Sequence, residues 1–154
     1  MFGGMNMTHK LPIDRGGLIL ALRSDLSSHE AAYYLDTETG ALILFTVEFS
    51  ENPEYGVPDD IQYNPRYLEI TPFRSHDTFQ IMEDFIDTLE PGGIADRLTQ
   101  AISGKKPFRR FKDALYDYPN LPEQWFQFED LALTQMAEAW CRGNGIEFQW
   151  IGDA

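Results

Sequence analysis

A short basic stretch stands out in an otherwise acidic chain. Within eight positions lie five of the twelve Lys and Arg residues of the 154-residue sequence: Lys105, Lys106, Arg109, Arg110 and Lys112. Proline suits the first turn of a helix, so Pro107 predicts a helix that begins there and carries most of these cations. Backbone N–H groups at that end of a helix favour anions. The stretch could therefore contact a phosphate, a carboxylate, an RNA backbone or an acidic protein surface.

The same cations could instead pair with carboxylates of the chain itself, since the sequence holds 25 Asp and Glu. Asp113 and Asp117 are close candidates in sequence, and Arg110 could be a buried fork that organises neighbouring helices. The aromatic residues add no support for RNA binding, because helical spacing predicts that Phe108 and Phe111 face the core. Internal pairing and partner contact both stay open at this point.

Other reactive side chains form no recognisable catalytic or metal-binding pattern. The histidines His9, His29 and His76 are scattered, whereas a structural zinc site needs four Cys or His ligands. Cys141 follows Trp140 near a predicted helix end, where the helix dipole opposes a thiolate, and we interpret it as a small packed side chain. Phosphate-loop, dinucleotide-binding and Gly-x-Ser-x-Gly motifs are absent from the sequence. We predict no catalytic residues, no metal ligands and no cofactor.

Charge and composition limit the classes of partner and the location. A net charge of −13 repels polyanions, so nucleic acid is an unlikely partner, whereas a basic protein would be attracted. The sequence shows no apolar run of about 20 residues, and residues 1–10 lack the apolar core of a secretion signal. A single cysteine is typical of a reducing compartment. We expect a cytoplasmic protein without membrane spans and with a loose tail over residues 1–10.

Period-two alternation dominates the first half of the chain. Residues 18–26 favour a short helix, although a strand is possible there. Residues 31–36 and 41–49 predict an antiparallel hairpin around a turn that ends at Gly40. A Pro-rich loop with room for a helical turn follows at 51–65. A third strand is then expected at 66–70.

Helical periodicity dominates the second half. Four helices are expected, and their proposed apolar faces are Phe79–Met82–Ile86–Leu89, Ile94–Leu98–Ile102, Phe108–Phe111–Leu115 and Trp125–Phe128–Ala132–Met136–Trp140. A strand at 146–150 could rejoin the N-terminal sheet as its fourth member. Strands followed by helices indicate an α+β fold. We predict one domain over residues 11–154, with a small, mostly antiparallel sheet packed against about four helices.

Several segments together resemble a bacterial family of uncharacterised proteins. They are Tyr33-Tyr-Leu-Asp-Thr-Glu-Thr-Gly40, Met82-x-x-Phe85-Ile86, Ala101-Ile-x-Gly-Lys-x-x-Phe-Arg-Arg-Phe-Lys-Asp113 and Trp125. The resemblance covers roughly residues 14–145, and the Gly-Lys-x-x-Phe-Arg-Arg-Phe-Lys run is its most specific part. Pro107 departs from the family pattern, in which a small residue is usual. The resemblance implies the fold and a bacterial origin, and it brings no activity with it.

The sequence favours a non-enzymatic cytosolic binding or regulatory protein that uses the basic helix over 105–112 as its contact face. One alternative is an acidic inhibitor of a basic partner, in the manner of immunity proteins, and it rests on the net charge. A second alternative is an RNA or phosphometabolite binder. An enzyme stays open as a less favoured interpretation, and a protein partner is the favoured ligand class.

Overall fold

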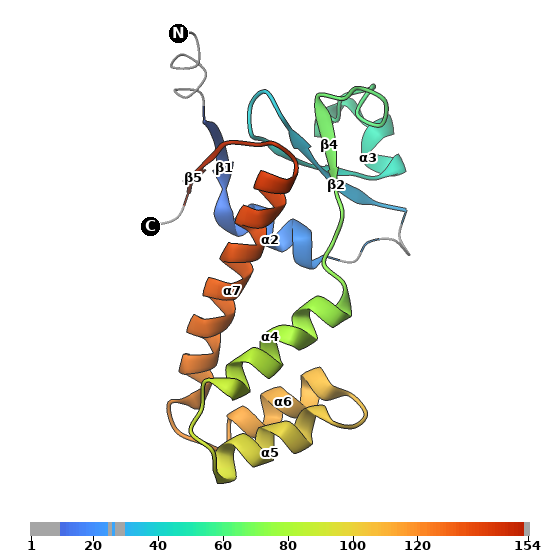
Figure 1. Ribbon diagram of the computed structural model, residues 1–154. Coiled ribbons are helices and arrows are strands. Elements are labelled where there is room, and N and C mark those ends of the chain that lie inside the picture. The colour runs from blue at the N-terminus through green and yellow to red at the C-terminus, as the bar shows by residue number, and fades with distance from the viewer. Residues whose placement is uncertain (1–9, 25, 27–29, 153–154) are drawn as a thin grey trace, which may run out of the picture. The chain divides into compact units, whose positions relative to one another are not determined.

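The computed structural model describes residues 10–24, 26 and 30–152, which divide into two compact units (Figure 1). Unit 1 contains the described residues up to Phe73 and those from Thr134 onward, and unit 2 contains Arg74–Leu133. The α+β class is confirmed, because helices and strands both occur. Nine residues of the predicted N-terminal tail, residues 1–9, lie outside the described part of the chain.

Unit 1 holds the described strands and several helices. They are β1 (Leu11–Asp14), α2 (Arg15–Arg23), β2 (Ala32–Asp36), β3 (Leu42–Phe45), α3 (Val47–Glu51), the 3-10 helix η2 (Pro53–Tyr55), β4 (Tyr67–Ile70), the end of α7 (Leu121–Gly143) and β5 (Phe148–Ile151). The order β3-β2-β4 gives an antiparallel sheet, which confirms the predicted hairpin and third strand. Gly40 closes the hairpin turn at φ +84°, a conformation that suits glycine.

The C-terminal strand corrects one prediction. β5 does not join the hairpin sheet; it pairs in parallel with β1, with Leu11 opposite Phe148 and Ile13 opposite Trp150. The predicted alternation along β5 is present, since Phe148 and Trp150 are half-buried and Gln149 is exposed. What the sequence concealed was β1, because four residues that include a proline and one buried side chain, Ile13, carry almost no strand signal.

Two element boundaries in unit 1 also differ from prediction. The predicted helix at 18–26 is α2 over Arg15–Arg23, because Asp14 caps it by accepting a hydrogen bond from the N–H of Gly17 at 3.2 Å. The strand predicted at 41–49 ends at Phe45, because Thr46 caps a new helix and accepts from the N–H of Phe49 at 2.9 Å. The Thr46 hydroxyl satisfies a free N–H group in the first turn of α3. The chain therefore changes from strand to helix at Thr46, although the apolar alternation in the sequence continues to Phe49.

Unit 2 is helical, and the four predicted helices are all present: α4 (Ser75–Asp87), α5 (Gly93–Ile102), α6 (Pro107–Leu115) and the start of α7. Its core is aromatic, with the Phe111 ring 6.3 Å from that of Phe85 and 4.8 Å from that of Trp125. Edge-on rings at such distances attract each other through their quadrupoles. This cluster fixes α4, α6 and α7 within the unit.

The buried helix faces match the prediction in part, and the residues buried as predicted are Met82, Ile86, Leu98, Ile102, Phe111, Leu115 and Trp125. On α4 the buried residues include Ile81 and Phe85, while Phe79 is half-buried. Ile94 and Phe108 are exposed, although both were predicted to face the core. On α7 the buried row is Leu121, Trp125, Leu133, Ala137 and Cys141. Ala137 and Cys141 are small residues, so a search of the sequence for large apolar side chains does not find them.

Candidate functional site

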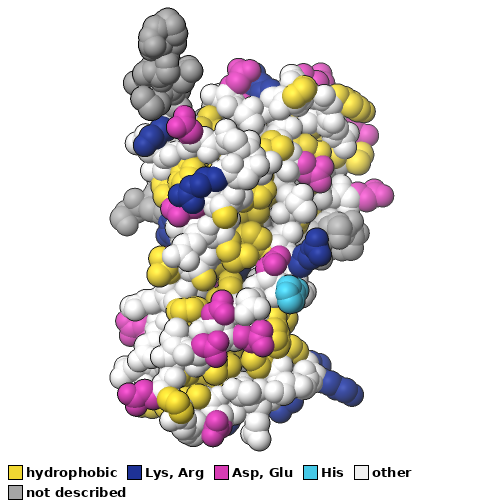
Figure 2. Space-filling model, viewed as in Figure 1, with side chains coloured by type: hydrophobic (Ala, Val, Ile, Leu, Met, Phe, Trp, Pro, Cys, Tyr) yellow, Lys and Arg dark blue, Asp and Glu magenta, His cyan; other side chains and the backbone are white. Residues whose placement is uncertain are grey.

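The five predicted contact residues lie together at the end of unit 2 where α5 leads into α6. Figure 2 shows dark blue side chains gathered at this edge of the unit. Lys105, Lys106, Arg109, Arg110 and Lys112 are all exposed. In the described part of the chain, none of the five has a carboxylate oxygen within 4.0 Å. The alternative of internal pairing is therefore wrong for this conformation, and so is the alternative of a buried Arg110.

Backbone geometry holds these cations in place. Lys106 adopts a left-handed conformation, φ 52° and ψ 53°, directly before α6, and Pro107 occupies the first turn as predicted. The N–H of Arg110 donates to the carbonyl of Lys106 at 3.0 Å. Its guanidinium folds back over Gly104, where a Cβ on the glycine would meet Nη1 at 2.9 Å. The glycine of the Gly-Lys-x-x-Phe-Arg-Arg run therefore makes room for Arg110.

Phe108, which lies between the cations in the sequence, is partly exposed, contrary to prediction. Phe108 is 39% exposed, and its ring stands edge-on to that of Phe79 at 6.5 Å. Phe111 and Leu115 anchor α6 from beneath, since both are fully or almost fully buried. An exposed ring beside arginines on a fixed helix is typical of a protein contact, in which Arg and aromatic residues contribute most of the binding free energy.

Acidic residues near the basic segment, which we define as residues 104–113, have other partners or face solvent. Asp117, a predicted partner for the cations, instead accepts a hydrogen bond from Nη2 of Arg97. That bond raises the pKa of Arg97, and it engages the carboxylate that could have neutralised the basic segment. Asp113 is exposed and lacks an ion pair among the described residues. Neither of these two carboxylates therefore neutralises the cations of the basic segment.

Unit 1 contains an ion pair between a buried carboxylate and a half-buried arginine that sequence reasoning missed. Asp36 is 5% exposed and accepts two hydrogen bonds from Arg66, from Nε at 2.9 Å and from Nη2 at 2.8 Å. It also accepts from the N–H of Glu38 at 2.9 Å. The Arg66 guanidinium holds the pKa of the Asp36 carboxyl well below its usual range, despite burial. The pair fixes the hairpin turn to the start of β4 and serves structure.

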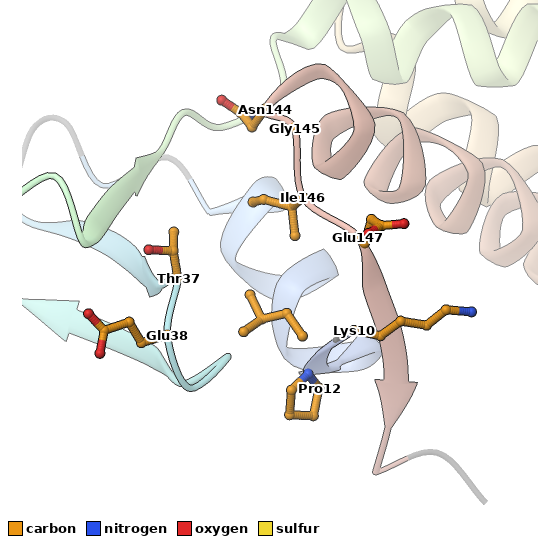
Figure 3. Close-up of a pocket in the computed structure, with 9 residues that line it drawn as sticks. Lys10, Pro12, Thr37, Glu38, Asn144, Gly145, Ile146 and Glu147 are labelled. Atoms are coloured by element: carbon orange, nitrogen blue, oxygen red, sulfur yellow. The ribbon is translucent and has the colours of Figure 1, made fainter. Parts of the chain in front are cut away.

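A cavity of about 550 Å³ lies in unit 1 between the start of β1, the hairpin turn and the link from α7 to β5. Figure 3 shows Ile146 and Thr37 on opposite walls, while Lys10 and Glu147 point away from it. The Thr37 hydroxyl already donates to the carbonyl of Arg66 at 2.7 Å. Glu38 at the rim lies 3.6 Å from a nitrogen of the same arginine. Two polar side chains of the lining, those of Thr37 and Glu38, are thus already engaged by the protein.

The remaining nucleophile is inaccessible. Cys141 is fully buried, and this burial raises the pKa of its thiol to about 11. A protonated, enclosed thiol is a poor nucleophile, so its interpretation as a packed core residue is confirmed. Among the described residues, no group of three or more His, Cys, Asp or Glu side chains is arranged to hold a metal ion.

Comparison with known proteins places both units in one family. The model of an uncharacterised protein family, UPF0158, matches residues 12–153, which is nearly the whole chain. The chain belongs to the UPF0158 family. One UPF0158 relative, UPF0158 protein PA5073 of Pseudomonas aeruginosa, is 29% identical over 116 residues, which cover 75% of this chain and 74% of the relative. The expected resemblance to an uncharacterised bacterial family is thus confirmed.

The UPF0158 match includes the basic segment, the aromatic core of unit 2 and the ion pair of unit 1, since all lie within residues 12–153. No solved structure matches the chain. None of the helices described is long and apolar enough to cross a membrane. The exposed surfaces of this UPF0158 chain are therefore the basis for inferring its function.

Proposed function

We propose that this UPF0158 chain is a binding or regulatory protein that contacts an acidic protein surface through its basic segment, residues 104–113. The observation that carries the proposal is the lack of ion pairs at the five cations of this segment, within the described residues. Unit 2 holds 11 Asp and Glu against seven Lys and Arg, so carboxylates were available nearby. Cations left unpaired in such surroundings are free for a partner's carboxylates.

A protein partner fits the basic segment better than a nucleic acid does. The whole chain carries a net charge of −13, so a long polyphosphate backbone that runs past the five cations would meet acidic surface on either side, whereas a local group of carboxylates need not. A protein surface offers local carboxylates beside apolar groups. The first would meet Arg109 and Arg110, and the second would meet the exposed ring of Phe108.

We also place this interaction in the cytosol. The support is the acidic, cysteine-poor composition and the buried, unpaired thiol of Cys141, both of which suit a reducing compartment. Fractionation of cells that express the tagged full chain tests the location. Recovery of the chain mainly outside the soluble cytosolic fraction would contradict it.

A copolymer of Glu and Tyr is a suitable acidic probe for the basic segment. The triple variant Arg109→Ala, Arg110→Ala and Lys112→Ala removes three exposed cations from α6. The matched control Lys10→Ala, Arg74→Ala and Arg142→Ala removes the same number of Lys and Arg elsewhere. We expect the first variant to weaken binding by about tenfold or more and the control by about twofold, because long-range charge alone changes affinity little.

Two outcomes of this titration overturn the proposal. Equal weakening by both variants would mean that net charge, and not the basic segment, governs binding. Tighter binding of a single-stranded RNA probe, lost in the α6 variant, would assign the segment to nucleic acid. The substituted side chains are all exposed, so we expect the helices to be intact in each variant. Circular dichroism checks this.

A further inference from the structure

We propose that unit 1 carries a second contact surface, the acidic segment over residues 47–63, which binds a basic protein segment with Lys or Arg beside aromatic or aliphatic side chains. The inference goes beyond the proposed function, because it concerns the other unit, the opposite charge and a different partner. It rests on three observations, namely unpaired carboxylates, exposed apolar side chains and a backbone that fixes both.

The carboxylates of the acidic segment have no cationic partner among the described residues. They are Glu48, Glu51, Glu54, Asp59 and Asp60, and all five are exposed. No Lys or Arg occurs anywhere from residue 24 to residue 65. Unit 1 as a whole has 14 Asp and Glu against five Lys and Arg, and Arg66 and Arg142 are paired with carboxylates of the unit. The negative charge of the segment therefore stays uncompensated.

Large apolar side chains are exposed between these acids. Val47 is 52% exposed, Tyr55 is 53% exposed and Tyr63 is 82% exposed. Figure 2 shows hydrophobic and acidic side chains intermingled over the part of unit 1 that carries α3 and β4. Exposed tyrosines are typical of contact surfaces, because a rigid ring buries much area at a small entropic cost.

The backbone of the acidic segment is fixed in spite of its prolines. Thr46 caps α3, and Asn52 caps η2 by accepting a hydrogen bond from the N–H of Glu54 at 3.0 Å. The rings of Phe49 and Tyr55 stack at 4.2 Å with an interplanar angle of 22°. Ile61, near the far end of the segment, is 2% exposed, so this end is also packed against the protein. A surface ordered before binding loses less entropy when a partner docks.

Charge complementarity identifies the occupant. The five unpaired carboxylates of the segment attract Lys or Arg, and the exposed rings of Tyr55 and Tyr63 can pack against the aliphatic stems or stack on guanidinium groups. A nucleic acid or an acidic lipid surface would be repelled by the same charges. The fitting partner is a basic stretch of protein that also offers apolar side chains.

A copolymer of Lys and Tyr serves as the probe for this surface, with the full chain as the receptor. The triple variant Glu51→Gln, Glu54→Gln and Asp59→Asn neutralises the acidic segment. The control Glu83→Gln, Asp87→Asn and Glu90→Gln neutralises the same residue types on exposed positions of unit 2. We expect the first variant to weaken binding by about tenfold or more and the control by about twofold. Equal effects overturn the proposal.

A variant that leaves all charges in place tests the apolar part. Tyr63→Ser removes the most exposed ring, and we expect it to weaken binding of the copolymer by about fivefold, an effect that persists when salt screens the charges. Tyr116→Ser, at an exposed tyrosine of unit 2, is the matched control and should leave affinity unchanged. If the two tyrosine variants bind alike, the segment is a plain electrostatic surface and the proposal fails.

A second copy of the chain is the other conceivable occupant, because its basic segment has the complementary charge. Sedimentation velocity over a range of concentrations distinguishes the two. A monomer that binds the copolymer supports a separate basic partner. Self-association would overturn the proposal if it is lost in both the acidic-segment variant and the α6 variant, because the segment would then bind another copy of the chain. This outcome does not affect the test of the basic segment with the acidic probe.

Discussion

The acidic segment of unit 1 and the basic segment of unit 2 present charge in different ways. On α6 the cations project from a regular helix, held from beneath by Phe111 in an aromatic core. The acidic segment contains only the short helices α3 and η2, and capping side chains such as Thr46 and Asn52 fix it locally. A surface on a helix depends on distant packing, whereas a surface on a capped loop depends on its neighbours in sequence. Different substitutions should therefore abolish binding at the two segments.

Loss of the core anchor beneath α6 gives the largest expected effect. Phe111→Ala removes a fully buried ring that contacts Phe85 and Trp125, and we expect a loss of about 3–5 kcal/mol in the free energy of unfolding. Urea denaturation followed by tryptophan fluorescence measures it. In the folded fraction, binding of the acidic probe should fall while binding of the basic probe persists. A loss below about 1 kcal/mol would contradict the view that this ring anchors the basic segment.

Disruption of the pair between Asp36 and Arg66 comes next. Asp36→Asn weakens the hydrogen bonds that β2 makes to Arg66, three residues beyond the acidic segment, and we expect a loss of about 1.5–3 kcal/mol in the free energy of unfolding, as for hydrogen bonds to a charged group. Arg66 then keeps only the exposed carboxylate of Glu38, 3.6 Å away, as an ionic partner, which leaves more positive charge near the acidic segment. Binding of the basic probe should therefore weaken, which is the converse of the Phe111→Ala result.

The same pair makes stability depend on pH with a defined sign. The folded-state pKa of Asp36 is lowered, so its contribution is fully present above the pKa of about 4 of an unfolded aspartate and is lost as the pH falls towards the folded value. Thermal unfolding of the wild type should show this loss below about pH 4, and Asp36→Asn should lack that part of the dependence. An unchanged acid limb in the variant would exclude Asp36 as its source.

The sequence predicted the basic segment and missed the acidic one for a physical reason. Five cations contrast with a chain of net charge −13, whereas five more acids resemble the rest of it. The same contrast explains the fold. Long periodic segments gave the four helices of unit 2 and the hairpin, but β1 has one buried side chain and the turn at Thr46 is set by a single hydroxyl. Short elements fixed by one contact leave no periodic pattern to detect.

The two exposed tyrosines of the acidic segment, Tyr55 and Tyr63, are expected to differ in their contribution to stability. Tyr55→Ala removes the stack on Phe49 and should cost about 0.5–1.5 kcal/mol of stability, as is typical of aromatic pairs. Tyr63→Ala removes an almost fully exposed ring and should change stability by about 0.5 kcal/mol or less. Thermal unfolding of both variants checks the difference. Equal stability losses would mean that the stacked pair does not fix the segment.

The smallest stability effect is expected at Gly104, and it carries the most specific information on the basic segment. A Cβ at this position would lie 2.9 Å from Nη1 of Arg110, the mobile end of a long side chain, so Gly104→Ala should change the free energy of unfolding by about 0.5 kcal/mol or less. The guanidinium must nevertheless move off the link between α5 and α6. We expect binding of the acidic probe to weaken by about twofold to threefold, measured by fluorescence anisotropy. The same substitution in an Arg110→Ala background should then have no further effect on binding, because the displaced group is already gone. A further loss of affinity in the double variant would show that Gly104 acts through the backbone of the link between α5 and α6. In that case its effect on binding would not come from the position of Arg110.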